Sequence, residues 1–192
     1  PSIDDEYLEL IDGINDALKP LEGKPPLISG ETAIHPDIET FDIAGFGVGA
    51  CPKKNYIDGK NIKEDDLILG LRSSGFHSNG YTLIRKVWLE KEAVRSKDRD
   101  KIIQRLLTPS RIYVNTVLAL LRKYAPSING ICHITGGGRE NLNRLMGENL
   151  NLRPRWNDNW TRPPEFEFIQ KNGKISDESL LHIDGYNHHI NS

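Results

Sequence analysis

The chain has 192 residues and a mass of 21.7 kDa, which is the size of one domain, or of one domain and part of another. Its 25 basic and 27 acidic residues give a net charge of −2, which excludes the strongly basic surface of a nucleic-acid-binding domain and a polyacidic tail. Hydrophobic residues make up 37% of the chain, enough for one core, and no apolar run is long enough to span a membrane.

The N-terminal part predicts a helix followed by two strands. Apolar residues at helical spacing predict a helix over residues 3–18, which Pro20 and Gly23 end. Two apolar runs, at residues 26–29 and 41–50, predict strands.

The rest of the chain alternates between predicted strands and helices. Apolar runs at residues 66–71 and 130–134 predict buried strands. Five further segments predict helices by their spacing or start signals: 81–91, 98–107, 109–124, 140–146 and 164–171. Thr108 is expected to cap the third of these helices, with Pro109 in its first turn. This alternation indicates an α/β or α+β domain.

The two cysteines, Cys51 and Cys132, lie far apart in the sequence. They fit neither a disulfide framework nor a zinc site. A reducing compartment, the cytoplasm, is therefore expected.

Three polar loops each follow a predicted strand, the place where ligands bind in α/β sheets. The first loop contains Gly30, Glu31 and Thr32. A carboxylate there is suited to bind a substrate amine or Mg²⁺. An ordinary surface turn fits the same residues.

The second loop runs from Ser73 to Gly80 and leads into a predicted helix. A side chain of this loop can cap that helix, whose first amides form an anion site. His77 is suited to donate to phosphate or to act as a general acid or base. A capped loop with an incidental histidine is the alternative. The candidate binding residues of this loop are Ser74, Ser78, Asn79 and Gly80.

The third loop contains Thr135, Gly136, Gly137 and Gly138. Three glycines between a strand and a helix let the backbone approach a phosphate closely. The loop is neither a Walker A loop nor a dinucleotide-binding fingerprint. A tight connection that needs positive φ is the alternative.

Five motifs follow one another along the chain, at residues 30–33, 41–49, 73–80, 107–114 and 133–138. They read Gly-Glu-Thr-Ala, Phe-Asp-Ile-Ala-Gly-Phe-Gly-Val-Gly, Ser-Ser-Gly-Phe-His-Ser-Asn-Gly, Leu-Thr-Pro-Ser-Arg-Ile-Tyr-Val and His-Ile-Thr-Gly-Gly-Gly. In this order they resemble aminoimidazole ribonucleotide synthetase, also called phosphoribosylformylglycinamidine cyclo-ligase. The resemblance covers about residues 27–178.

The resemblance implies an ATP-dependent ring closure in purine biosynthesis, which converts formylglycinamidine ribonucleotide to aminoimidazole ribonucleotide. It implies an α+β fold with a mixed β-sheet covered by helices, ATP and Mg²⁺ as cofactors, and a homodimer. The loops at 73–80 and 135–138 would line the substrate cleft. His77 would be a general acid/base or a phosphate-binding residue, and Glu31 would contact the substrate or the metal.

The sequence also departs from the family pattern. The Asp-Gly-Val-Gly-Thr-Lys motif that binds Mg-ATP in the family is absent from these residues. We expect residues 1–29 to be a remnant of the N-terminal ATP-binding domain, 30–178 the C-terminal substrate-binding domain, and 179–192 an unmatched tail. Ser29 stands where the family has its first glycine, and the glycine loop is one residue short after Gly138.

Two alternatives stay open. One is a non-catalytic domain that binds a nucleotide or phosphate, or serves as a scaffold. The other is a different ATP-using relative: formylglycinamidine synthetase, selenophosphate synthetase or thiamine-phosphate kinase. ATP turnover by the purified chain would separate these readings, and we expect substrate binding without ATP hydrolysis.

Overall fold

The computed structural model describes residues 3–33, 42–90, 99–146, 151–156 and 163–177. The chain divides into two compact units, one formed by residues 1–56 and 112–125 and the other by 57–111 and 126–192. The expected tail, 179–192, lies outside the described residues, and the domain boundaries after residues 29 and 178 stay predictions. None of the helices in the described ranges has the length and apolar character needed to cross a membrane.

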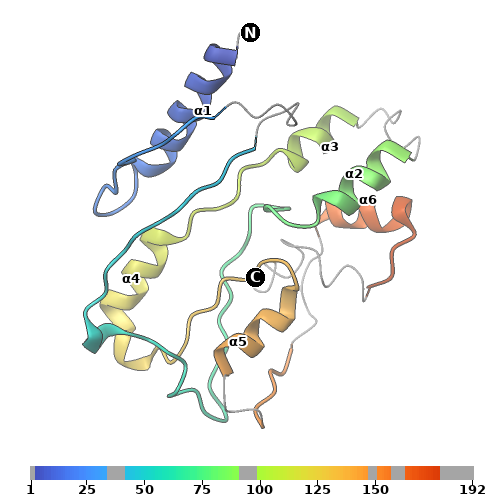
Figure 1. Cartoon of the computed structure of the whole chain (residues 1–192). Coiled ribbons are helices and arrows are strands. Elements are labelled where there is room, and N and C mark those ends of the chain that lie inside the picture. The colour runs from blue at the N-terminus through green and yellow to red at the C-terminus, as the bar shows by residue number, and fades with distance from the viewer. Residues whose placement is uncertain (1–2, 34–41, 91–98, 147–150, 157–162, 178–192) are drawn as a thin grey trace. The chain divides into compact units, whose positions relative to one another are not determined.

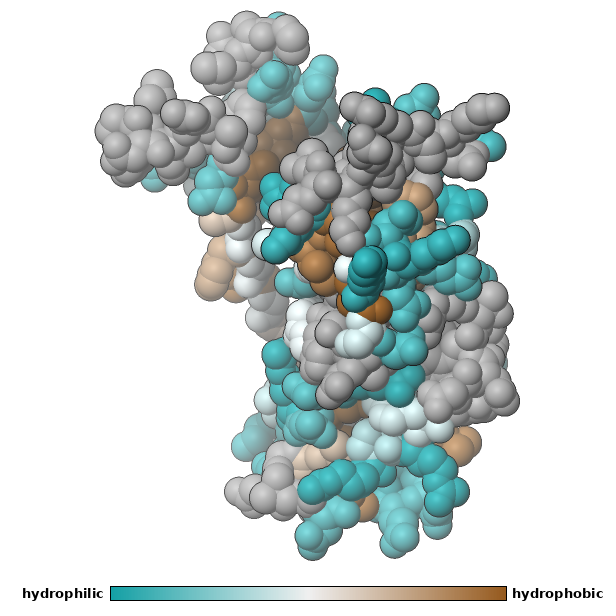
Figure 2. Space-filling view, turned by 90° about the vertical axis from the view of Figure 1, so that its right-hand side faces the viewer, coloured by the Kyte–Doolittle hydropathy of each residue, from teal (hydrophilic) through white to brown (hydrophobic). Residues whose placement is uncertain are grey.

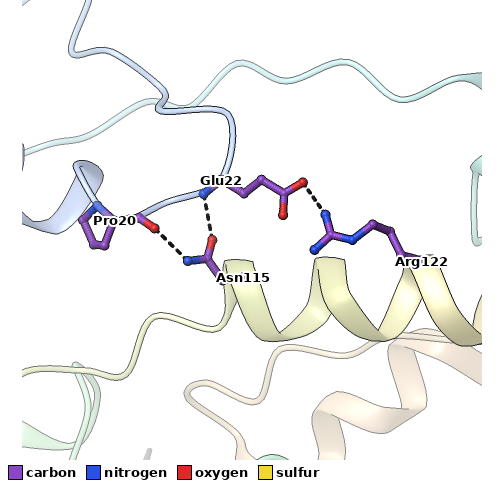
Figure 3. A network of polar contacts seen from close by, with 4 residues as sticks. All are labelled: Pro20, Glu22, Asn115 and Arg122. Atoms are coloured by element: carbon purple, nitrogen blue, oxygen red, sulfur yellow. Dashed lines mark hydrogen bonds and ion pairs between the residues drawn. The ribbon is translucent and has the colours of Figure 1, made fainter.

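The first unit contains α1 (Ile3–Leu18), the short 3-10 helix η1 (Lys53–Asn55) and α4 (Val114–Tyr124). The predicted helix over residues 3–18 is therefore confirmed. At the N-terminal end of α4, Asn115 donates from Nδ2 to the Pro20 carbonyl and accepts the Glu22 amide at Oδ1, both at 2.7 Å. Arg122 also forms an ion pair with Glu22 (Figure 3). These contacts hold the turn after α1 against α4.

The second unit is built on α2 (Tyr81–Glu90), α3 (Arg99–Leu106) and α6 (Pro164–Gly173), with α6 packed against both other helices (Figure 1). These bounds confirm the helices predicted at 81–91, 98–107 and 164–171. The core consists of Phe76, Ile84, Val87, Leu106, Phe166 and Ile169. Burial of these side chains is the main force that holds the three helices together.

The helix predicted over residues 140–146 forms as two short pieces. A 3-10 helix, η4 (Gly138–Leu142), begins at the last of the three glycines, and α5 (Asn143–Met146) continues it. A further 3-10 turn, η3 (Ala125–Ser127), follows α4.

The helix predicted over residues 109–124 forms only from Val114 to Tyr124, as α4, so the prediction that Thr108 caps it is wrong. Thr108 instead closes α3: its amide donates to the Arg105 carbonyl and its Oγ1 to the Gln104 carbonyl, both at 3.2 Å. A threonine hydroxyl that bonds back to the preceding turn in this way competes with an N-cap role.

The predicted mixed β-sheet covered by helices is wrong for the described residues, which contain helices and extended segments but no strand. The runs 26–29, 42–50, 66–71 and 130–134 are extended without a ladder; residue 41 lies outside the described residues. An apolar run favours an extended backbone and burial, but a strand also needs a neighbour at ladder distance.

Two of these runs, 66–71 and 130–134, come close to each other without forming a strand pair. Asn129 Nδ2 donates to Asp66 Oδ2 at 2.8 Å, so the starts of the two runs are joined through side chains. Leu67 stays 89% exposed, and in the first unit Phe46 is 96% exposed. Figure 2 shows hydrophobic residues, in brown, at the surface among hydrophilic ones.

Candidate functional site

The loop from Ser73 to Gly80 is anchored in the core of the second unit. Phe76 is fully buried, and its ring centroid lies 4.0 Å from that of Phe166 in α6. Gly75 has φ +137°, a conformation that other residues rarely adopt, and a Cβ there would lie 3.5 Å from Glu165 Oε1. Because Phe76 is buried against Phe166, the middle of the loop is fixed, and the other loop residues are held in defined positions.

His77, a residue of this loop, is buried, with only 7% of its surface exposed. Its Nε2 atom lies 3.3 Å from the backbone amide of Ser74 and 3.4 Å from that of Arg111. The Ser74 hydroxyl donates to the Pro109 carbonyl at 2.7 Å. We call Ser74, His77, Pro109 and Arg111 the clasp, because they join the loop to the segment that follows α3.

Two further contacts strengthen the same junction. Arg111 Nη1 donates to the Arg72 carbonyl at 2.8 Å, and Ser78 Oγ lies 3.3 Å from Ser110 Oγ. These bonds explain why the residues from Pro109 to Arg111 do not become helical.

The glycine loop is held by one buried side chain. Asn141, 2% exposed, accepts at Oδ1 from the Thr135 amide (3.2 Å) and hydroxyl (3.1 Å), and donates from Nδ2 to the Gly136 carbonyl (3.1 Å). Gly137 has φ +91°, and a Cβ there would lie 3.2 Å from Asn141 Nδ2. Both the backbone conformation and the close amide require glycine at this position.

The structure brings the second and third predicted loops together. A Cβ added to Gly136 would lie 3.3 Å from Asn79 Oδ1, so the Asn79 side chain lies directly on the glycine loop. Ser78 and Asn79 are exposed, whereas Thr135 and Gly136 are half-buried. We call this surface, made by residues 78–80 and 135–138, the two-loop surface. It combines hydroxyl, amide and backbone groups that hydrogen-bond phosphate or ribose oxygens.

Two neighbours of the glycine loop carry polar or reactive groups. The Arg139 guanidinium lies over the Trp156 ring, 4.8 Å from its centroid. Cys132 Sγ donates to the Asn141 carbonyl at 3.3 Å. Burial raises the pKa of the Cys132 thiol, and the charge of Arg144 opposes this in part. The thiol is therefore poorly suited to act as a nucleophile.

Gly30, Glu31 and Thr32 belong to the first unit, where they are exposed on extended backbone. Their predicted roles, like those of the two loops in the second unit, stay predictions. Among the residues with described placement, no three His, Cys, Asp or Glu side chains gather into a group that could hold a metal ion.

Sequence reasoning missed the residues that support the site. Asn141 follows Gly138 by three positions in an ordinary helical pattern, so nothing local marks it. Arg111 was placed inside a predicted helix, which hid its contact with His77. Arg111 contacts segments that are distant in the sequence, and Asn141 depends on the conformation of the glycine turn. No residue pattern shows either.

Comparison with known proteins defines the class. Residues 63–182 match the family model described as AIR synthase related protein, C-terminal domain, and the chain belongs to this family.

Its curated relatives carry a more specific name, phosphoribosylformylglycinamidine cyclo-ligase. The chain is 42% identical to the protein of Bordetella avium over 166 residues, which is 82% of this chain and 46% of the relative. It is 41% identical to that of Xylella fastidiosa over 162 residues (80% and 45%), and 45% identical to that of Pseudothermotoga lettingae over 161 residues (80% and 47%). The chain thus spans about half the length of the curated relatives it matches, and the resemblance inferred from the five motifs is confirmed.

Proposed function

We propose that this chain provides the substrate-binding part of a phosphoribosylformylglycinamidine cyclo-ligase. In that reaction, ATP-dependent ring closure converts formylglycinamidine ribonucleotide to aminoimidazole ribonucleotide. The observation that carries the proposal is the contact between Asn79 and Gly136, which joins two separately predicted loops into one surface. The relatives' shared name supports the choice of substrate.

The two-loop surface is proposed to hold the ribose phosphate of the substrate. Ser78 supplies a hydroxyl, Asn79 supplies an amide, and the backbone from Gly136 to Gly138 allows close approach. Thr135 donates its amide and hydroxyl to Asn141, so it supports the glycine loop. Ser74 and Gly80 shape the same loop. Because the chain is nearly neutral, anion binding here depends on oriented donors rather than on a strongly basic surface.

Glu31, with Gly30 and Thr32, belongs to the first unit, and its contact with the substrate or the metal stays a prediction from the resemblance. His77 was predicted either to move protons or to bind phosphate.

ATP would supply the phosphoryl group that activates the formamide oxygen, with Mg²⁺ neutralising its phosphates. The family's Mg-ATP motif is absent from this sequence, and the described part of the chain offers no metal-binding group of side chains. The described residues therefore do not fit these cofactors, and we propose that this chain alone binds substrate without hydrolysing ATP. A cytoplasmic location, predicted from the two cysteines, and a homodimer, implied by the resemblance, stay predictions.

Calorimetric titration of the chain with formylglycinamidine ribonucleotide tests the proposal. We expect saturable binding, weakened about tenfold by Asn79→Ala, because one donor to a charged phosphate is lost. Asn61→Ala, an exposed asparagine of the same unit, is the matched control and should bind like the wild type. No binding by the wild type would favour the scaffold reading, and ATP hydrolysis by the chain alone would contradict the proposed division of labour.

A further inference from the structure

The imidazole of His77 is placed so that one of its nitrogens must accept hydrogen bonds. Nε2 faces the backbone amides of Ser74 at 3.3 Å and Arg111 at 3.4 Å. A backbone N–H only donates, so Nε2 carries a lone pair in both contacts. The ring is then neutral, with its hydrogen on Nδ1.

The third group near Nε2 fits the same assignment. The Ser74 hydroxyl also lies 3.3 Å from Nε2, but it lies closer, 2.7 Å, to the Pro109 carbonyl, to which it donates. The hydroxyl hydrogen therefore points to the carbonyl, and the two amides remain the donors to the ring.

This geometry conflicts with proton transfer through Nε2. A general acid or base must bring a ring nitrogen within hydrogen-bond reach of the substrate. Here Nε2 already accepts hydrogen bonds from two backbone amides of the protein, and His77 is only 7% exposed.

We propose that His77 is a positioning residue: its Nε2 gathers the amides of Ser74 and Arg111 and so sets the loop that presents Ser78 and Asn79. Without this acceptor, two amides in a part-buried place would lose their partner, and the loop would part from the segment after α3. The proposal rests on the proposed function only for what the loop binds. The tautomer and the clasp stand without it.

The ring of the wild-type protein can be observed directly. Long-range ¹H–¹⁵N NMR at pH 7, with the His77 signal assigned by its loss in His77→Gln, reports the hydrogen on each ring nitrogen. We expect a protonated Nδ1 and an unprotonated Nε2. A hydrogen on Nε2, in the other tautomer or in a charged ring, would overturn the proposal.

Two variants that replace the imidazole with a side-chain amide then separate a positioning role of His77 from proton transfer. His77→Gln places a carbonyl oxygen near the position of Nε2, whereas His77→Asn places it near Nδ1. We expect the Ser74 and Arg111 amides to exchange with deuterium within about threefold of the wild-type rate in His77→Gln. In His77→Asn the rate should rise at least about tenfold.

Binding of formylglycinamidine ribonucleotide should follow the same order, close to wild type for His77→Gln and about tenfold weaker for His77→Asn. Equal exchange rates in the two variants would overturn the clasp. If exchange behaves as expected while the wild type binds no ribonucleotide, the positioning role is supported and the proposed function is contradicted.

Discussion

Single buried polar side chains decide the shape of the candidate site. His77 and Asn141 each satisfy two or more backbone groups of a loop, and each is almost fully enclosed. Buried polar groups of this kind are costly when a partner is removed, so their contribution lies in holding one conformation.

Asn141→Ala tests this for the glycine loop. The change leaves the Thr135 amide and the Gly136 carbonyl without their side-chain partner, and we expect the free energy of unfolding to fall by about 2 kcal/mol. Asn143→Ala, at an exposed position two residues further on, should change it by no more than about 0.5 kcal/mol. Denaturant titration measures both, and equal losses would show that Asn141 has no special role.

The two cysteines should differ in reactivity. Cys51 is exposed, whereas Cys132 is half-buried and its pKa is raised by burial. Because the thiolate is the reacting form, we expect iodoacetamide at pH 8 to modify Cys51 about tenfold faster. Mass spectrometry of the labelled peptides gives both rates, and Cys51→Ser should leave only the slow site. A Cys132 that reacts as fast as Cys51 would contradict the described packing around it.

At the level of helices and extended segments, local patterns predicted what local forces determine. The spacing of apolar residues located α1, α2, α3 and α6 because an amphipathic helix needs only its own sequence and a surface to cover. The start of α4 was missed because Thr108 and Arg111 bond to other segments. The predicted strands do not form in the described residues, because pairing requires a second segment that an apolar run itself does not specify.

The junction of α1 and α4 gives a pH dependence. The hydrogen bond from Arg122 holds the pKa of Glu22 below its ordinary value of 4.5. A lowered pKa means that the stabilisation is present above that value and is lost as the pH falls through the folded-state pKa. We expect Glu22→Gln to be less stable than the wild type at pH 7, with the difference shrinking as the pH falls below 4.5.

Thermal unfolding followed by circular dichroism from pH 3 to pH 7 measures this difference. Glu9→Gln, an exposed position on α1, is the matched control and should keep the wild-type pH dependence. A wild type and a Glu22→Gln variant with parallel pH curves would show that the ion pair does not form in solution.

For the molecule as a whole, the five motifs predicted the family, and the comparison with known proteins confirms it. The proposed anion binding by a nearly neutral chain relies on oriented hydroxyl, amide and backbone groups, and groups of these kinds lie on the two-loop surface. The glycines and the Ser-Asn pair could be selected from the sequence because their residue types suit phosphate. The contact between the two loops could not be predicted from the sequence, because it depends on how Phe76 and Asn141 fix the loops.

Hydrogen–deuterium exchange of the chain with and without formylglycinamidine ribonucleotide tests most directly whether these loops form one binding surface. We predict that the ligand slows exchange in peptides covering Ser73–Gly80 and Thr135–Gly138 together, while peptides from the C-terminal half of α6 stay unchanged. Protection of only one loop, or of neither at saturating ligand, would contradict a shared substrate surface.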